Sequence, residues 1–227
     1  MSTAAADRAV ILSRIRESLR DVPAGERPED VEVPRAYNVA VDGEGAADAA
    51  APARDLVALF TERAADYRAT VIRTGPDELA AVIAGRLSER AVSRLVAPPG
   101  LPAEFLSRAN GYEILRDEPP LSVADLDACD AVVTGAALAL AVTGTIVLDG
   151  GVGQGRRALT LLPDYHLCVV RADQIVADIT VAVRRLDPTR PLTLISGPSA
   201  TSDIENTRVE GVHGPRTLDI IVLEARD

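Results

Sequence analysis

LVALFTERAADYRATVIRTGPDELAAVIAGRLSERAVSRLVA, residues 56–97, alternates between two kinds of apolar spacing. Over 56–67 apolar side chains recur at helical intervals, and over 70–73 they run together as in a strand. The same two patterns follow over 79–87 and 93–97. Strands separated by helices form βαβ units, in which the strands are parallel. The stretch therefore predicts an α/β fold with a mainly parallel sheet flanked by helices.

The rest of the chain extends this sheet. Further strands are expected over residues 112–115, 131–134, 145–149, 167–170, 192–196 and 218–223. Apolar residues over 175–186 recur at helical spacing and predict one more helix, with Asp173 as its cap. Only a short, polar and glycine-rich connection separates strands 145–149 and 167–170, so these two are expected to pair antiparallel.

The first 53 residues differ in composition from the rest. Residues 8–19 mix apolar residues at helical spacing with charged ones, which predicts a short amphipathic helix. Residues 21–52 are rich in Pro, Gly, Ala and acids, which indicates an extended linker or wrapping arm. We expect residues 1–53 to form an N-terminal helix and arm, and residues 54–227 to form one folded domain.

The overall composition narrows the class of protein. With two Phe, four Tyr and no Trp, the core has to be built from Leu, Val, Ile and Ala,. A formal net charge of −10 argues against a nucleic-acid partner, because neutralising phosphate requires clustered basic residues,. No apolar run reaches the ~20 residues that span a bilayer, and the start of the chain lacks a signal-peptide core. We therefore expect no membrane span and a cytoplasmic location.

The cysteines and histidines are few and scattered. Cys129 and Cys168 each lie in an apolar run and belong to no CxxC pair, so both are expected to be buried thiols,. His166 and His213 have no His or Cys at ligand spacing,. The sequence thus predicts no metal and no cofactor in this chain.

A small hydroxylic segment, Thr143-Gly144-Thr145, directly precedes an expected strand. Small residues around a glycine would let a ligand approach the backbone N–H groups closely. A tight turn that leads into the strand is the alternative explanation.

GGVGQGRR, residues 150–157, superficially resembles a dinucleotide fingerprint. It lacks the GxGxxG spacing, and Pro163 leaves too little room for a helix after it, so we reject nicotinamide-dinucleotide binding. Arg156 and Arg157 are candidates for binding a carboxylate or phosphate, because guanidinium groups bind both in bidentate fashion. Solvated surface charge is the alternative for each.

SGPSATSDIE, residues 196–205, follows an apolar strand and resembles the opening of a helix. Gly197, Ser199 and Thr201 would then belong to an anion cradle of hydroxyls and free backbone N–H groups, or Ser199 or Thr201 would simply cap the helix. Asp203 and Glu205 would either stabilise the helix start or face the ligand as base or hydrogen-bond acceptor.

The two histidines lie in different surroundings. His213, within EGVHGP at residues 210–215, is flanked by glycines and a proline, so it belongs to a loop and is a candidate for ligand contact or proton transfer,. His166 leads a strand after Pro163, where a structural hydrogen bond is the better explanation. We expect these segments to converge at one rim of the sheet as a polar pocket.

Four of these segments, in this order, resemble the LUD domain of the lactate-utilisation protein C family. They are TGTIVL at residues 143–148, the 156–166 stretch that ends in LLPDYH, SGPSATSDIE at 196–205 and GVHGP at 211–215. The opening ILSRIRESL, residues 11–19, is also similar to the start of that family. One departure is ALAV at 139–142, where many relatives carry an acidic residue.

The resemblance carries several implications. It implies a NagB/ribose-5-phosphate isomerase/CoA-transferase-like fold. It also implies a subunit of an L-lactate utilisation system that oxidises L-lactate to pyruvate with iron–sulfur partner subunits, which would hold the clusters. We expect such a subunit to bind a small anionic ligand. The alternatives are a freestanding isomerase or acyl/CoA-transferase-like enzyme, which uses Asp203, Glu205 or His213 as acid and base, and a structural scaffold.

Overall fold

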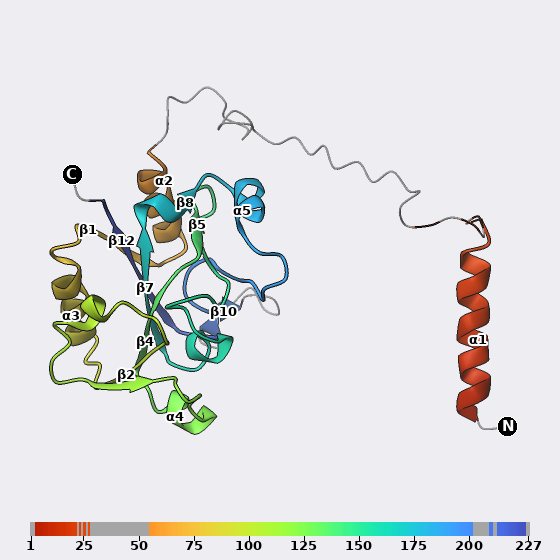
Figure 1. The fold of residues 1–227 in the computed structure, drawn as a ribbon, viewed down its shortest axis with the longest axis horizontal. Coiled ribbons are helices and arrows are strands. Elements are labelled where there is room, and N and C mark those ends of the chain that lie inside the picture. Colours follow the sequence, from red (N-terminus) through yellow and green to blue (C-terminus); the bar gives the residue numbers. More distant parts are fainter. Residues whose placement is uncertain are drawn as a thin grey trace. The chain divides into compact units, whose positions relative to one another are not determined.

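The structure is a computed structural model that describes residues 3–21, 23, 25, 27, 55–201, 209–210 and 213–225. Near the start, α1 (Thr3–Ser18) is the helix predicted there. From residue 55 onward the chain forms the α/β domain shown in Figure 1. No helix in these described ranges is long and apolar enough to cross a membrane.

The centre of the domain is a six-stranded sheet in which every neighbouring pair of strands is parallel. Its strands, in spatial order, are β1 (Thr70–Thr74), β12 (Thr217–Leu223), β7 (Tyr165–Arg171), β4 (Ala131–Gly135), β2 (Arg94–Ala97) and β3 (Glu113–Arg116). The predicted mainly parallel α/β sheet, flanked by helices, is confirmed. All six strands overlap strands that the sequence predicted.

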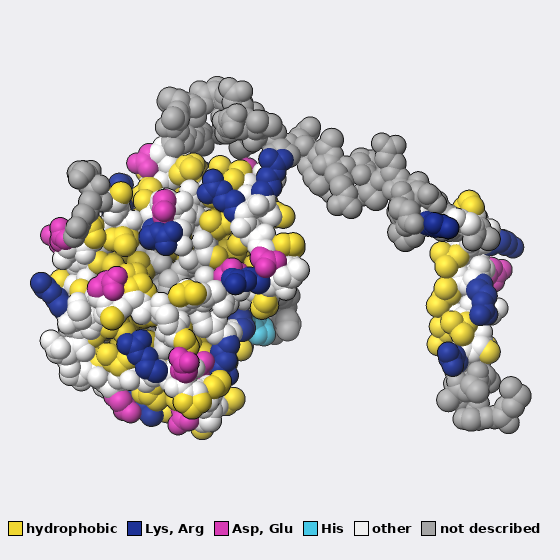
Figure 2. Space-filling view, viewed as in Figure 1, with side chains coloured by type: hydrophobic (Ala, Val, Ile, Leu, Met, Phe, Trp, Pro, Cys, Tyr) yellow, Lys and Arg dark blue, Asp and Glu magenta, His cyan; other side chains and the backbone are white. Residues whose placement is uncertain are grey.

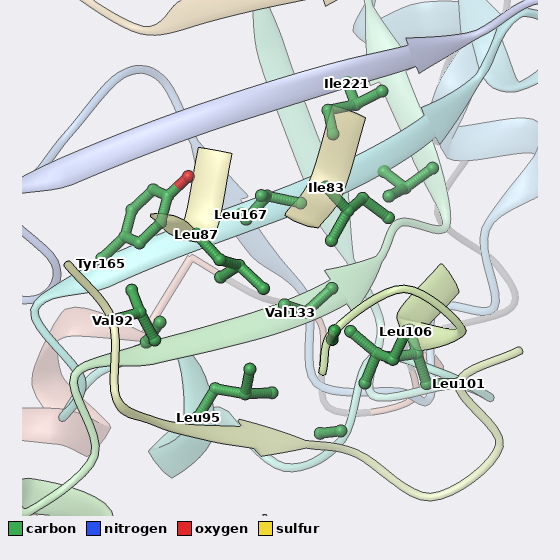
Figure 3. Packing of buried hydrophobic residues seen from close by; sticks show 14 of the residues in the cluster. Ile83, Leu87, Val92, Leu95, Leu101, Leu106, Val133, Tyr165, Leu167 and Ile221 are labelled. Atoms are coloured by element: carbon green, nitrogen blue, oxygen red, sulfur yellow. The ribbon is translucent and has the colours of Figure 1, made fainter. Parts of the chain in front are cut away.

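Alternate residues of the central strands face opposite layers, because side chains of a strand alternate between its two sides. On one side, α3 (Leu79–Glu89) and the short helix η3 (Ala103–Leu106) pack on Leu95, Val133 and Leu167 (Figure 3). The core on this side is aliphatic apart from Tyr165 and the partly buried Phe105 and Tyr112.

The opposite side of the sheet is covered by two helices and a second sheet. The helices are α2 (Leu56–Asp66), whose N-terminus is capped by Asp55, and α4 (Val123–Asp127). The second sheet has the order β8 (Ile175–Val176), β5 (Leu138–Leu140), β6 (Thr145–Leu148) and β9 (Thr193–Ile195). Residues of β5, β6 and α2 pack on Cys168, Val170 and Ile220 of the central sheet.

The second sheet corrects two predictions. Strand β6 pairs antiparallel with β5 and β9, and not with β7, because β12 and β4 already occupy both edges of β7. Ile175 and Val176 are not helical, since they pair as β8 with β5. The helix α5 (Ile179–Arg185) begins after Asp178, whose carboxylate accepts hydrogen bonds from Thr180 N and Val181 N, and Asp173 is therefore not its cap,.

The segment after β9 also differs from its prediction. Ala200–Thr201 form strand β10, which pairs antiparallel with β11 (Val209–Glu210), so the helix expected to open here does not begin at these residues. The backbone just before β10 is bonded to the segment that precedes β12, because Ser199 N donates to Pro215 O at 2.8 Å. The predicted acids Asp203 and Glu205 lie outside the described residues.

A buried polar cluster holds the starts of β7 and β12 together. Tyr165 Oη donates to Asp219 Oδ2 at 2.7 Å, and Arg86 Nε of α3 donates to the same oxygen at 2.8 Å. Asp219 is fully buried. Since Tyr165 precedes His166 and Asp219 follows Leu218, the cluster fixes two residues that face the opposite side of the sheet.

Both cysteines are buried, as the sequence predicted. They belong to separate apolar clusters, Cys168 under α2 and Cys129 beside α4. Burial raises the pKa of the Cys168 thiol to about 12, so this group stays protonated at ordinary pH.

Candidate functional site

A pocket of about 240 Å³ opens where β7 and β12 begin and β9 ends. We call it the serine–histidine pocket. It is lined by Arg157, Thr160, His166, residues 194–199, residues 213–215 and Leu218. Three of the four segments predicted to converge therefore contribute lining residues, and these include the candidates Arg157, Gly197, Ser199 and His213.

Ser199 joins two of the pocket's walls. Its hydroxyl accepts a hydrogen bond from His213 N at 3.1 Å, and its own N–H donates to Pro215 O at 2.8 Å. These bonds place the exposed His213 at the pocket beside the serine segment. The space-filling view shows histidine atoms at the surface of the domain next to arginine side chains (Figure 2).

Two glycines, one in the pocket wall and one in the segment behind it, allow the chain to lie directly against the end of α2. Gly197 has a φ of +78°, and a Cβ at this position would overlap the carbonyl oxygen of Tyr67. Gly144 has a φ of +60°, and a Cβ there would overlap the backbone of Arg63 and Ala64. Only glycine combines this left-handed conformation with such a close approach.

The predicted Thr143-Gly144-Thr145 segment lies behind the pocket and does not line it. Its hydroxyls form a chain, in which Thr143 Oγ1 lies 2.7 Å from Thr145 Oγ1, and Thr145 Oγ1 lies 2.7 Å from Ser196 Oγ. Thr145 is buried and Ser196 lines the pocket. In this structure the segment supports the serine wall from behind.

The neighbouring candidates Arg156 and Arg157 have different partners. Arg156 donates from Nε and Nη2 to the two oxygens of Asp117, at 2.8 and 3.0 Å, and lies outside the serine–histidine pocket. Arg157 donates from Nη1 to the carbonyl and hydroxyl oxygens of Thr160. Arg157 forms no ion pair within the described part of the chain, so its charge remains available at the pocket.

The structure adds His166, for which the sequence favoured a purely structural role. That hydrogen bond exists, since Nε2 lies 2.8 Å from Thr134 Oγ1, but the ring also forms part of the pocket lining. Burial, and then the positive charge of Arg157, lower the pKa of His166 to about 3. The imidazole is therefore neutral at physiological pH. Its place in the LLPDYH motif was the one signal in the sequence that could have pointed to it.

The charges around this pocket favour an anion. Arg157 contributes a guanidinium, and no Asp or Glu is among the described residues that line it. Thr160, Ser196 and Ser199 add hydroxyls, which can donate to a carboxylate or phosphate oxygen,. No group of three or more His, Cys, Asp or Glu side chains in the described ranges could hold a metal ion. The side chain of Thr201, a further ligand candidate, is outside the description.

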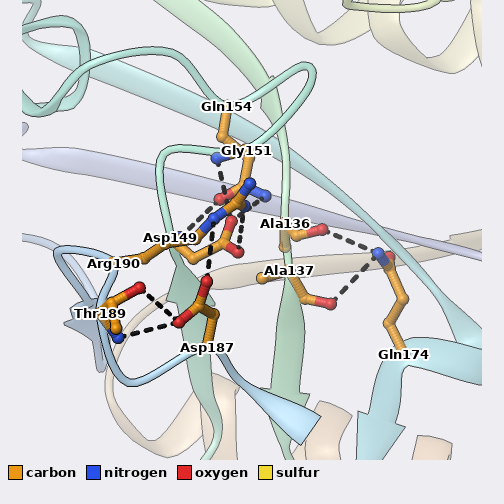
Figure 4. A network of polar contacts seen from close by, with 9 residues as sticks. All are labelled: Ala136, Ala137, Asp149, Gly151, Gln154, Gln174, Asp187, Thr189 and Arg190. Atoms are coloured by element: carbon orange, nitrogen blue, oxygen red, sulfur yellow. Dashed lines mark hydrogen bonds and ion pairs between the residues drawn. The ribbon is translucent and has the colours of Figure 1, made fainter.

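A second and larger pocket, of about 680 Å³, lies beside the glycine-rich loop of residues 150–155. We call it the glycine-loop pocket. Asp149 holds this loop, because it accepts hydrogen bonds from Gly151 N, Gln154 Nε2 and Arg190 Nη1, at 2.9, 2.9 and 2.8 Å (Figure 4). The two arginines that line this pocket, Arg156 and Arg190, are both paired with carboxylates.

Comparisons with known proteins agree on one family. The model of the LUD domain matches residues 57–223. The chain is 51% identical to "Lactate utilization protein C" of Deinococcus radiodurans over 168 residues, which cover 72% of this chain and 77% of that protein. It is 34% identical to "Lactate utilization protein C" of Shouchella clausii over 113 residues, or 45% of this chain and 48% of that protein.

A solved structure shows the same similarity in three dimensions. The crystal structure of a duf162 family protein from Deinococcus radiodurans superposes with a TM-score of 0.64 at 44% sequence identity. The match covers 74% of this chain and 96% of that one.

Proposed function

The chain belongs to the LUD domain family, and from this premise we propose that it serves lactate utilisation by binding a small anionic ligand in the serine–histidine pocket. The names of its relatives support the process. The pocket supports the ligand class, and one observation carries it: Arg157 brings a positive charge to a pocket whose described lining contains no carboxylate.

The size and the polar groups of the pocket fit a small carboxylate. A volume of about 240 Å³ suits a ligand of few heavy atoms,. A guanidinium can hold a carboxylate through two parallel hydrogen bonds, and the Ser199 hydroxyl lies on the same pocket wall as His213,. L-lactate and pyruvate are therefore the first ligands to test.

Partner subunits belong to the same proposal. An oxidation of lactate requires an electron acceptor, and Cys129 and Cys168 are buried in separate clusters where they cannot ligate an iron–sulfur cluster together. In the proposed system, iron–sulfur subunits carry the electrons, and this chain contributes the ligand site. Copurification of the full chain with iron–sulfur proteins from lactate-grown cells tests this part.

The ligand site is tested by calorimetric titration of the full chain with L-lactate, pyruvate and uncharged lactamide. We expect the two acids to bind and lactamide not to bind. Arg157→Gln should weaken the binding of both acids at least about tenfold, because it removes a charge-assisted hydrogen bond of about 1.5–3 kcal/mol. The matched control is Arg184→Gln, which changes an exposed arginine of α5 and should leave both affinities unchanged.

Growth on lactate connects the site to the process. A clean deletion should abolish growth on L-lactate, wild type and Arg184→Gln should restore it, and Arg157→Gln should restore it poorly. Equal affinity of wild type and Arg157→Gln for both acids would refute the site. Normal growth of the deletion strain on lactate would instead refute the process.

A further inference from the structure

His166 has one ring nitrogen that the fold does not use. The residue is 1% exposed, yet it lines the serine–histidine pocket. Nε2 is engaged with Thr134 Oγ1, whereas Nδ1 has no hydrogen-bond partner among the described residues. A group in the pocket that hydrogen-bonds Nδ1 would use a ring nitrogen that the described residues leave unpaired.

The surroundings of His166 keep the ring neutral. Behind it, Thr134 is fully buried on β4, and the protonated thiol of Cys168 lies 3.6 Å from Gly135 O. Among the groups that face the ring, Arg157 is charged, and its positive charge opposes a second one on the imidazole. A neutral imidazole offers one N–H donor and one acceptor, so its second nitrogen can hydrogen-bond either a hydroxyl or a keto oxygen.

Arg157 and His166 therefore suit two different groups of one ligand. Arg157 suits a carboxylate, and Nδ1 of His166 suits a hydroxyl or keto oxygen. Both line a pocket of about 240 Å³, so the two groups of the ligand have to be close together.

We propose that His166 is a specificity residue that binds the hydroxyl or keto oxygen of a small 2-hydroxy or 2-oxo acid, whose carboxylate is held by Arg157. This rests on the proposed function, because it presumes that the pocket binds a small carboxylate. It goes further in naming the ligand class and the atom that selects it. Thr134 engages Nε2, so Nδ1 is the ring nitrogen left for a ligand in the pocket that His166 lines.

Two substitutions separate the two ring nitrogens. In His166→Gln the longer amide reaches the position of Nε2 and can keep the bond to Thr134, but the group at Nδ1 is lost. In His166→Asn the shorter amide lies near the position of Nδ1, while the bond to Thr134 is lost. The two variants change the same buried position and each keeps a side-chain amide, so each controls for the other.

The experiment compares the affinities of L-lactate, pyruvate and propionate, which lacks the second oxygen, for the full chain and both variants. In wild type we expect L-lactate, pyruvate or both to bind up to about tenfold tighter than propionate, as one hydrogen bond allows. His166→Gln should abolish this preference and leave propionate binding unchanged, and His166→Asn should keep it. Binding of both lactate and pyruvate would indicate that Nδ1 carries the proton, since a keto oxygen only accepts.

A second measurement does not depend on the folding of any variant at this position. The chain has two histidines, so selective ¹⁵N-histidine labelling gives few ring signals, and His213→Gln assigns them. Titration with lactate or pyruvate should shift the Nδ1 resonance of His166, whereas propionate should shift it little.

The outcomes separate this inference from the function on which it rests. If neither lactate nor pyruvate binds wild type more tightly than propionate, or if His166→Gln weakens all three acids equally, the role of His166 is refuted while the anion site stands. An unmoved Nδ1 resonance in saturated protein refutes it as well. If no carboxylate binds wild type, the proposed ligand class fails and this inference fails with it.

Discussion

Two consecutive arginines line two different pockets, Arg156 the glycine-loop pocket and Arg157 the serine–histidine pocket, and they differ in their partners. On the glycine-loop side, Arg156 is paired with Asp117, and Arg190 is paired with Asp149. On the other side, Arg157 forms no ion pair within the part of the chain that the structure describes. The arginines of the glycine-loop pocket are neutralised by the protein's own carboxylates. The charge of Arg157 in the serine–histidine pocket is left for a ligand to neutralise.

The titration of the acids follows this difference. Burial alone would raise the pKa of Asp117 and of Asp149, but hydrogen bonds from Arg156 to the first and from Arg190 to the second lower both below 3.8. These carboxylates stay charged and act as internal counter-ions. A position in a conspicuous glycine-rich motif is therefore weaker grounds for assigning a ligand than a charge without an internal partner.

The largest expected effect is a difference in stability between glycine substitutions in the backbones of the two regions. Gly197→Ala should destabilise the protein by about 3 kcal/mol, because the new Cβ combines a positive φ with an overlap on the Tyr67 carbonyl,. Gly150→Ala also has a positive φ, +67°, but the nearest atom is 3.8 Å away, so it should cost only about 1 kcal/mol,. Urea unfolding of both variants measures the difference.

Equal losses in these two variants would mean that the pocket wall is not pinned against the end of α2. The serine wall would then not differ from the glycine-rich loop in how closely its backbone is packed.

The next effect is the pH dependence of the free energy of unfolding, to which the titratable groups of the two regions contribute over different pH ranges. His166 has a pKa of about 3 in the fold and 6.5 in the unfolded chain, so between these values the unfolded state binds more protons. Stability should therefore fall as the pH falls below 6.5, by about 1.4 kcal/mol per unit, or about 2.5 kcal/mol between pH 7.5 and 4.5. The lowered pKa values of Asp117 and Asp149 act only below about 3.8.

Urea unfolding midpoints, measured in steps of ~1 pH unit at pH 7.5, 6.5, 5.5 and 4.5, test this prediction. In His166→Gln this component should be absent, so wild type and variant should converge as the pH falls. A wild-type slope that persists unchanged in the variant would assign it to other groups and would leave the burial of a neutral His166 unsupported.

The fold was largely predictable from the sequence, and the errors of the prediction have physical causes. The strands β2, β4, β7 and β12 are largely buried on both sides, so their apolar runs are distinct. The second sheet was partly missed because β5 and β8 are short, and Ile175 and Val176 happen to continue the helical spacing of α5. The pairing of β6 depends on which strand edges are free, and spacing along the chain does not reveal this.

The site was less predictable for a related reason. Residue types and motifs pointed to Arg157, Ser199 and His213, and the structure brings these three to one pocket. Arg156 has the same side chain as its neighbour, and only the position of Asp117 distinguishes them. His166 was assigned its hydrogen bond correctly, but whether the other nitrogen faces protein or pocket depends on segments far away in the sequence.

The smallest expected effect is also the most direct test of the two arginines. Arg156→Gln should cost about 1.5 kcal/mol, because it leaves the nearly buried Asp117 without its ion pair, and partial exposure of Arg156 reduces the loss,. Arg157→Gln should change the free energy of unfolding by less than about 0.5 kcal/mol, as exposed substitutions do,. Urea unfolding measures both, with Arg184→Gln as the surface control. If Arg157→Gln were as costly as Arg156→Gln, its guanidinium would serve the fold, and the unbalanced charge that distinguishes the serine–histidine pocket would be lost.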